Sequence, residues 1–303
     1  MRIDVRSSRL LIGLMCAQTM LAGPCLARKR VPVAVPVTVT VPVPSDPKAT
    51  LALIDAALTD DRIAAAQSRI ATAHGRAPEV ELALRQAECA RGSGLLDDAA
   101  VGFSKLVSDP VVGGRALAGL GITELRRGHD AAAIRAIDQA VARDPGFVRA
   151  WIARGVAADR AHDWATADNA YARALALDPA SDTALVNRGY SRLLRGAYAE
   201  GASDLQAAVR LRPTSVTAQT NLRLALALAG NYKAAFRGSN KATLPHDLNT
   251  VGFAAMARGD YSVAESLFNR AMELSPAFDH TAWDNLQYLK QMTQRPDPAR
   301  PTP

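Results

Sequence analysis

Apolar and small residues recur along most of the chain at the three- and four-residue spacing of helices that bury one face. The clearest case is residues 148–179, where two such stretches flank a short polar turn and Pro179 follows the second. Proline cannot continue a helix, so it marks the end of that stretch. The pattern predicts two paired helices, with these positions on the buried faces: Trp151, Arg154, Gly155 and Ala158 in the first, and Ala167, Tyr171 and Ala174 in the second.

The sizes of these side chains predict how the two helices pack. Gly155 and Ala167 are small, and we expect them where the helices cross. Trp151 and Tyr171 are large, and we expect them where the pair meets its neighbours. Alternation of small and large residues across facing positions lets packed layers interdigitate.

The same pattern returns every 34 residues, with Pro145, Pro179 and Pro213 each closing one unit. A period of this length indicates stacked supersecondary units. Pro276 lies 63 residues after Pro213, short of two full periods, and Gly238-Ser239-Asn240 stands in the gap, so we predict a shortened helix and a kink or weak point there. Well-matched units occupy residues 114–145, 148–179, 182–213 and 245–276, and degenerate ones occupy 47–80, 81–110 and 216–243.

We therefore predict an all-α protein whose repeats span residues 47–292. Aromatic residues make up only 5% of the chain and alanine is abundant, which fits close packing of helices. Residues 280–292 are predicted to form a helix that caps the last apolar face, as a stack of repeats requires for solubility. Residues 293–303 are rich in proline and are predicted to be a flexible tail.

The positions in residues 148–179 resemble the signature of the tetratricopeptide repeat (TPR), W-x2-L-G-x2-Y, then A-x3-F, then P. The sequence departs from it at Arg154 and Ala158, where the family often has Leu and Tyr, and at Gly201 in the next unit, where Ala is usual. The resemblance implies a right-handed α-solenoid of stacked helix-turn-helix units with a concave binding face.

In that family, positions 2, 5, 9 and 12 of the first helix of each unit usually line the concave face. Asn187 and Asn221 stand at position 6, where an Asn in some relatives bonds the backbone of a bound peptide; the alternative is that Asn is simply common there. The Lys and Arg set with which some relatives clamp a carboxylate is not present in the matching helices. The resemblance thus implies these contact residues for a partner protein: Arg149, Ile152, Val156, Asp159, Thr183, Val186, Asn187, Tyr190, Leu193, Thr217, Thr220, Asn221 and Leu224.

The N-terminus has the pattern of a secretory signal peptide over residues 1–27. Arg2, Arg6 and Arg9 precede an apolar stretch at residues 10–23 that is short for a membrane span. We expect cleavage after Ala27 and export to the periplasm. Acylation of Cys25, which would place the protein at the outer membrane, and an uncleaved anchor remain alternatives; Pro24 stands where a lipoprotein signal has a small residue.

Residues 28–46 follow as a Val/Pro-rich segment. Four prolines from Pro32 to Pro44 remove backbone donors and fix φ, which favours an extended spacer. An edge strand over residues 33–41 that adds to a partner sheet is the alternative.

Charge and candidate chemistry exclude several classes of function. The formal charge is +7, but charges alternate along the predicted helices and no basic patch is interleaved with aromatic residues, which disfavours nucleic-acid binding. Of three cysteines only Cys89 follows the signal region, and it lies on an apolar face. No metal-binding, phosphate-loop or nucleophile-elbow motif occurs. We expect no cofactor, no metal and no catalysis.

The sequence therefore favours a non-catalytic scaffold or adaptor of the bacterial cell envelope that binds other proteins. An exported protein of TPR units that contains a run like Leu224 to Gly230 resembles proteins of tight-adherence (Tad/Flp-type) pilus assembly. This resemblance implies a role in pilus or secretion-system assembly. A periplasmic chaperone-like client-binding factor and an accessory module of envelope polysaccharide export are the alternatives.

Overall fold

The computed structural model describes residues 46–294, and every regular element in that range is an α-helix. This confirms the predicted all-α class. The predicted signal peptide, Cys25, nearly all of the Val/Pro-rich segment and the tail beyond Gln294 lie outside the described residues. The helices are α2 (Pro47–Thr59), α3 (Ile63–Ala73), α4 (Glu79–Gly92), α5 (Leu96–Ser104), α6 (Gly113–Arg127), α7 (Asp130–Arg143), α8 (Val148–Arg160), α9 (Trp164–Leu177), α10 (Asp182–Leu194), α11 (Tyr198–Leu211), α12 (Val216–Leu228), α13 (Tyr232–Ala235), α14 (Leu244–Arg258), α15 (Tyr261–Leu274) and α16 (His280–Gln294).

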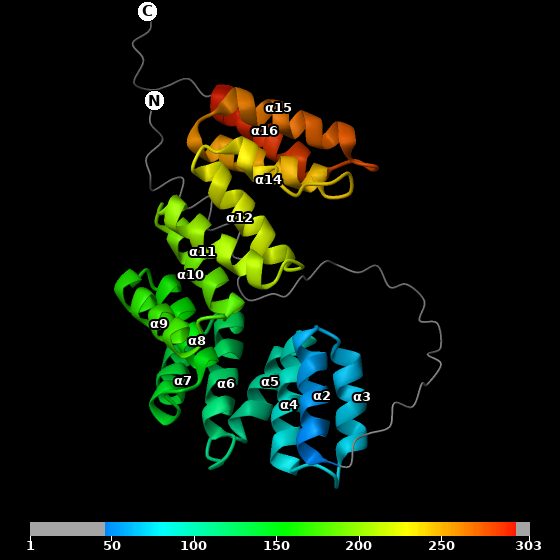
Figure 1. Ribbon diagram of the computed structural model, residues 1–303, viewed down its shortest axis with the longest axis vertical. Helices are drawn as coiled ribbons and strands as arrows, with labels where there is room; N and C mark the ends of the chain where they lie inside the picture. Colours follow the sequence, from blue (N-terminus) through cyan, green and yellow to red (C-terminus); the bar gives the residue numbers. More distant parts are fainter. Residues whose placement is uncertain (1–45, 295–303) are drawn as a thin grey trace, which may run out of the picture. The chain divides into compact units, whose positions relative to one another are not determined.

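The described residues divide into two compact units, which we call the N-terminal unit (46–179) and the C-terminal unit (180–294). Consecutive helices pair as antiparallel hairpins, four in the N-terminal unit and three, followed by α16, in the C-terminal unit (Figure 1). We call the members of each pair the first and second helix. Within a unit, the first helices of successive hairpins also contact one another, as α4 does with α2 and α6. None of the described helices is both long and apolar enough to cross a membrane.

A left-handed residue recurs in the turn between the two helices of a hairpin. Gly94, Gly128, Gly196 and Gly230 all have φ between +80° and +84° and share one position of the 34-residue period. His162 stands at that position in α8–α9 and adopts φ of 57° without being glycine. The hairpin of α8 and α9 therefore keeps the left-handed turn although glycine, the residue that adopts it most easily, is absent.

In four hairpins, a glycine on the first helix faces a large side chain sixteen residues later on the second helix. A Cβ atom built on Gly155 would lie 2.5 Å from Cε1 of Tyr171, which is fully buried. The close approach of Gly155 to the second helix was expected, but the position of Tyr171 was not, because its ring lies inside its own hairpin and covers Gly155. Ile137, Leu205 and Phe268 take the same place opposite Gly121, Gly189 and Gly252.

The hairpin of α12 and α13 breaks this rule. Arg223 occupies the position held 34 residues earlier by Gly189, and its side chain is only 8% exposed. Its Nη1 atom pairs with Oδ1 of Asp247 on α14 at 2.8 Å, and its Nε atom donates to the Ala235 carbonyl at 3.1 Å. A bulky cation thus lies where other hairpins bring the second helix close. The second helix α13 has four residues, as the Gly238-Ser239-Asn240 sequence predicted.

Arginines of one first helix donate to carbonyls at the end of the preceding first helix. Carbonyls of a last helical turn lack partners within the helix and carry partial negative charge, so a guanidinium there is favourable. The bonds run from Nη1 of Arg126 to the carbonyl of Arg91 (2.7 Å), from Nη1 of Arg160 to that of Leu125 (3.1 Å), and from Nη1 of Arg258 to that of Leu228 (2.7 Å).

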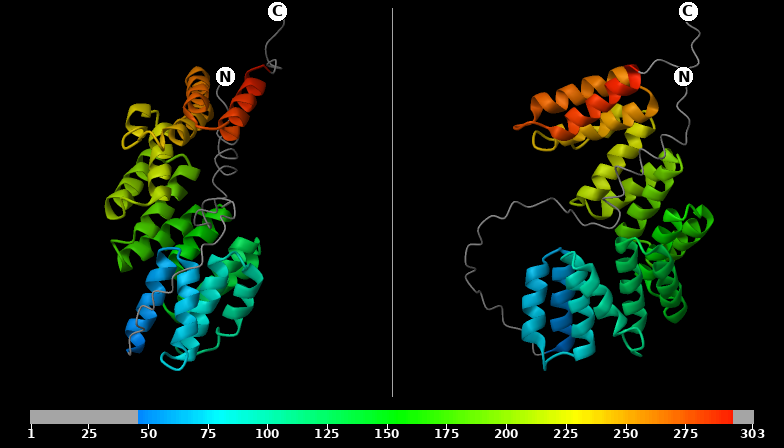
Figure 2. Two further views of the ribbon diagram at one scale, coloured as in Figure 1. Left: turned by 90° about the vertical axis from the view of Figure 1, so that its right-hand side faces the viewer. Right: turned by 180° about the vertical axis from the view of Figure 1, so that it is seen from behind.

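Helix α16 packs against both α14 and α15, which Figure 2 shows from two further sides. Its Ala282, Leu286 and Leu289 are buried, and Ala282 belongs to the same apolar cluster as Leu248 of α14 and Ala271 of α15. The helix therefore covers the apolar face that the last hairpin would otherwise expose.

Candidate functional site

The thirteen residues implied as partner contacts lie on three first helices: four on α8 in the N-terminal unit, and nine on α10 and α12 in the C-terminal unit. Arg149, Thr183 and Thr217 are exposed, and Val186, Asn187 and Thr220 are partly exposed. The other seven are buried, so a partner reaches little of their side chains. These buried residues are Ile152, Val156, Asp159, Tyr190, Leu193, Asn221 and Leu224.

The polar members of this set differ in their bonding. Asp159 accepts a hydrogen bond from the Tyr171 hydroxyl at 2.8 Å, which gives it a role in holding α8 and α9 together. The Asn187 amide donates to the carbonyl of Thr183 at 2.8 Å within its own helix. The side-chain amide of Asn221 forms no hydrogen bond among the described residues, although the residue is only 6% exposed. Burial thus leaves little of the Asn221 amide open to an added polypeptide.

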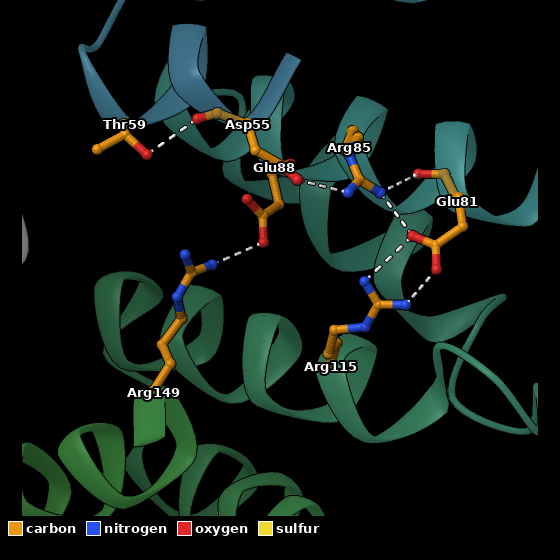
Figure 3. A network of polar contacts seen from close by, with 7 residues as sticks. All are labelled: Asp55, Thr59, Glu81, Arg85, Glu88, Arg115 and Arg149. Atoms are coloured by element: carbon orange, nitrogen blue, oxygen red, sulfur yellow. Dashed lines mark hydrogen bonds and ion pairs between the residues drawn. The ribbon is translucent and has the colours of Figure 1, made fainter. Parts of the chain in front are cut away.

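A network of charged side chains joins the first helices of the N-terminal unit (Figure 3). Arg85 on α4, with its side chain 8% exposed, pairs through Nη2 with Asp55 Oδ2 on α2 at 2.7 Å and through Nη1 with Glu81 Oε2 at 2.5 Å. Arg115 on α6 binds both carboxylate oxygens of Glu81, one of them at 3.1 Å. Three helices are thus linked through alternating acids and bases.

Pairing in this network shifts the pKa values of Glu81 and Arg85. Burial acts to raise the pKa of Glu81, but hydrogen bonds and charge from Arg115 and Arg85 outweigh it and lower the pKa below the ordinary value of 4.5. Burial likewise acts to lower the pKa of Arg85, and Asp55 and Glu81 overcome it, so that this pKa is raised. The network is charged and internally balanced at neutral pH.

Further along the same helices, Arg149 of α8 pairs through Nη1 with Oε1 of Glu88 on α4 at 2.8 Å (Figure 3). Glu88 is 17% exposed and Arg149 53% exposed at their side chains. Arg91 follows Glu88 by one helical turn, and its Nε atom is buried with no hydrogen-bond partner among the described residues. The first helices of this unit thus present fixed charged groups, with Arg149 open to a partner.

Apart from Arg149, these charged residues were absent from the implied contact set, although the repeat frame contains the signal that locates them. Glu81 and Arg115 precede Arg149 by two periods and one period, so all three occupy position 2 of successive units. Glu88 and Arg91 stand at positions 9 and 12 of the second unit. The contact set was taken only from the three units in residues 148–243. The earlier units match the repeat signature less well, so their residues at the same positions were not included.

A cavity of about 510 Å³ lies between α11, α12 and the short α13 in the C-terminal unit. Its walls include Val209, Leu222, Leu226 and Ala235, together with the guanidinium-bearing Arg223 and Arg237. The cavity occupies the place where α13 is shorter than the 14-residue second helices α7, α9, α11 and α15.

Cys89 and clusters of metal-ligating side chains are the remaining candidates for chemistry. Cys89 is fully buried among apolar residues of α2, α3 and α4, and burial raises the pKa of its thiol to about 11, so the thiolate is scarce at neutral pH. Between residues 46 and 294, no three His, Cys, Asp or Glu side chains gather closely enough to hold a metal ion.

Comparison with known proteins supports the tetratricopeptide repeat family. Residues 119–167 and 154–216 match the family model described as tetratricopeptide repeat. A tetratricopeptide repeat protein from Parabacteroides merdae ATCC 43184 is similar in structure, with TM-score 0.50 and 14% identity over 80% of this chain and 98% of its own. A chain of the APC/C hetero-tetramer Cut9–Hcn1 has TM-score 0.61 and 15% identity, covering 84% of this chain and 51% of its own. No curated protein matches the sequence. Identities this low show a shared fold alone.

Proposed function

We propose that this chain is a non-catalytic scaffold or adaptor of the bacterial cell envelope that binds a partner polypeptide along the first helices of its hairpins. TPR proteins generally mediate protein–protein interactions, and the family is typically non-catalytic. The observation that carries the proposal is the surface of the first helices. In each unit these helices contact one another in succession and carry exposed polar groups at position 2, namely Arg149 on α8, Thr183 on α10 and Thr217 on α12.

The geometry suits an extended or helical segment of another protein. Neighbouring first helices contact one another within a unit, and in the N-terminal unit ion pairs restrain Glu81, Arg115 and Arg149 on these helices. Preorganised side chains lose little conformational entropy when a ligand binds, which favours affinity.

The envelope location rests on the N-terminal sequence, with three arginines before an apolar stretch at residues 10–23. We propose that the process is pilus or secretion-system assembly, because the run Leu224–Gly230 resembles proteins of tight-adherence pilus assembly. Four residues of that run are buried in α12, so packing of the helix also accounts for its composition.

Binding is tested with paired surface variants. Thr183→Arg with Thr217→Arg adds two bulky cations to the proposed surface, whereas Ser262→Arg with Ser266→Arg adds the same groups to the exposed side of α15. Chemical crosslinking and affinity capture from an envelope extract should recover one defined complex with wild type and the α15 variant, and lose it with the first variant. Equal capture by all three proteins would contradict the binding surface. Recovery of many unrelated proteins would favour the chaperone-like alternative.

Location is tested separately by fractionation of cells that express the full chain. We expect the protein in the periplasmic or outer-membrane fraction, shorter than the full sequence by the signal peptide in mass spectrometry. Leu11→Arg with Ile12→Arg, which interrupts the apolar stretch, should hold the protein in the cytoplasm. A full-length wild-type protein in the cytoplasm would contradict the proposed location.

A further inference from the structure

The hairpin of α12 and α13 leaves a cavity where its second helix ends early. The cavity measures about 510 Å³ and is bounded by α11 and α12, which lie side by side in Figure 1, and by α13. The second helices α7, α9, α11 and α15 each have 14 residues, whereas α13 has four. Most of a second helix is therefore missing beside α12.

The wall that α12 contributes is the face that a first helix normally turns to its own second helix. Leu222 and Leu226 line the cavity and are partly exposed. One period earlier, the same positions hold Arg188 and Arg192 of α10. Both pair with Asp204 of the second helix α11, through Nη2 of Arg188 at 2.8 Å and Nη1 of Arg192 at 2.6 Å. In α12 this face is aliphatic and has no full second helix to cover it.

The remaining walls agree with an empty helix position. Gly238 stands one period after Asp204, so this hairpin lacks the acidic side chain as well as the helix that would carry it. Gly238 lines the cavity, and Val209 and Ala202 add apolar surface from α11. The loss of the charges on α12 and the loss of their partner thus occur together, which leaves an aliphatic surface in place of a polar contact.

The charged side chains around the cavity are all positive. Arg223 and Arg237 line it, and no aspartate or glutamate does. Arg223 is committed to Asp247 on α14 through their 2.8 Å ion pair. Arg237 is exposed and forms no ion pair within residues 46–294. An occupant of complementary charge therefore carries an acidic side chain next to its apolar face.

We propose that an amphipathic helix of a partner protein lies in this cavity and takes the place of the missing part of the second helix. Its apolar stripe contacts Leu222, Leu226 and Val209, and an acidic residue beside the stripe pairs with Arg237. The occupant is a helix because a helix covers the same face of α10. Apolar residues three and four positions apart give a helix such a stripe.

The cavity is separate from the surface of the first helices that the proposed function uses. Thr220 of α12 belongs to that surface, and Leu222 follows it by two residues. Each residue of an α-helix turns by about 100°, so the two side chains point to nearly opposite sides of α12. The chain can therefore hold a second polypeptide at the cavity, and this inference does not depend on the proposed function.

The probe is a fluorescein-labelled peptide of Leu, Glu and Ala, as long as a full second helix, with leucines spaced three and four residues apart. The control peptide has the same composition but distributes its leucines over all sides. Fluorescence anisotropy with the full chain should detect binding of the first peptide alone. A helix this short is marginal in water, so circular dichroism should also show that binding raises the helicity of the peptide. Equal binding of both peptides, or binding without a gain in helicity, would contradict the proposal.

Leu222→Gln with Leu226→Gln tests the aliphatic wall, and α10 shows that these positions accept long polar side chains. We expect the affinity for the peptide to fall at least about tenfold, because two apolar contacts are lost. Leu177→Gln with Leu274→Gln makes the same exchange at two leucines that are each 38% exposed and end α9 and α15. This control should bind like wild type. An equal loss in both variants would show that the cavity is not the site.

Arg237→Glu tests the charge. It should weaken binding of the Glu peptide about twofold to fivefold, as expected for an exposed ion pair, and strengthen binding of a peptide with Lys in place of Glu by a similar factor. Arg173→Glu, at an exposed arginine of α9 without an ion pair among the described residues, should change neither affinity. If the two reversals act alike, Arg237 is not a contact of the occupant and the proposal fails.

Rival occupants give different results in the same experiment. A small amphiphile is the occupant if dodecanoate binds more tightly than the peptide and depends on Leu222 and Leu226. A second copy is the occupant if light scattering shows a dimer that the Leu222 and Leu226 variant loses. The apolar segment at residues 10–23 is the occupant if the peptide binds only after Leu11→Arg with Ile12→Arg. Each result would overturn the assignment to a partner helix.

Circular dichroism of the variants confirms that each is folded. Arg237 is exposed, so Arg237→Glu gives a result even if the variant at Leu222 and Leu226 unfolds.

Discussion

Gly155 and Tyr171 illustrate how one pair of side chains sets the approach of two helices. The tyrosine ring lies against the glycine backbone, and its hydroxyl donates to the buried carboxylate of Asp159 at 2.8 Å. The ring is therefore held by packing on one side and by a hydrogen bond on the other. Because protein interiors are close-packed, an added methyl group has no free volume to occupy here.

Gly155→Ala should lower the free energy of unfolding by about 1–3 kcal/mol, the usual cost of overpacking. The new Cβ atom would lie 2.5 Å from the Tyr171 ring, so the helices must separate or the ring must tilt. Urea denaturation followed by circular dichroism measures the change. Gly146→Ala is the control, since its Cβ atom would meet nothing nearer than 3.4 Å. Equal stability of the two variants would disprove the close packing at Gly155.

Glu81 gives the stability a defined response to acid. Its pKa is lower in the folded protein than the ordinary 4.5, so its stabilising contribution is present above that value and is lost as pH falls through the folded pKa. Between about pH 5 and pH 3, wild type should therefore lose more stability than Glu81→Gln. Thermal melts across this range test the difference, with Glu265→Gln on the exposed side of α15 as control. Parallel curves for wild type and Glu81→Gln would contradict the proposed linkage.

At the scale of the element, the hairpin of α12 and α13 shows what replaces the usual contact between first and second helices. A glycine permits a full second helix to pack closely, whereas the guanidinium of Arg223 bonds the end of a four-residue α13 and the carboxylate of Asp247 on α14. The hairpin is thus joined to its successor by a buried ion pair.

Arg223→Met should destabilise the C-terminal unit by about 3–5 kcal/mol, because it leaves the carboxylate of Asp247 buried without its cation. Adding Asp247→Leu should restore much of the loss, since a well-packed apolar pair can replace a buried ion pair at little cost. Denaturant unfolding of wild type, both single variants and the double variant gives the coupling energy. Additive effects would show that the two residues do not stabilise each other.

The helices themselves could be predicted from periodicity, because apolar spacing and the Pro-marked 34-residue period are local features of the sequence. The shortening of α13 could also be predicted, since Gly238-Ser239-Asn240 interrupts a helical pattern. The ion pair of Arg223 could not be predicted, because its partner Asp247 belongs to another hairpin. Burial of Tyr190 and Leu224 was missed for a similar reason: position in the repeat gives the face of a helix but not how closely its neighbour covers that face.

At the scale of the whole molecule, each compact unit is a short series of hairpins, and the C-terminal unit ends with α16. A terminal hairpin without a cover exposes the apolar face that an inner hairpin buries against its neighbour. The buried Leu286 and Leu289 of α16 supply that cover. The solubility of the unit therefore depends on a helix outside the well-matched repeats.

Leu286→Asp with Leu289→Asp should detach α16, lower the melting temperature and cause association of the protein through the exposed face of α14 and α15. Size-exclusion chromatography with light scattering measures the association. Tyr288→Asp, at a residue that is 42% exposed on the same helix, should leave the protein unchanged. A monodisperse double variant with wild-type stability would rule out the covering role.

The arginine bonds between successive first helices give each unit a direction. Arg126, Arg160 and Arg258 each donate backward, to the end of the helix that precedes them in the stack. Loss of a later hairpin therefore leaves main-chain carbonyls of the hairpin before it without their donor, whereas loss of an earlier hairpin leaves an arginine of the one after it without its acceptor. Fraying at the trailing end of a unit thus uncovers backbone acceptors, and fraying at its leading end frees cationic side chains, so the two ends of the same stack become sticky to different partners.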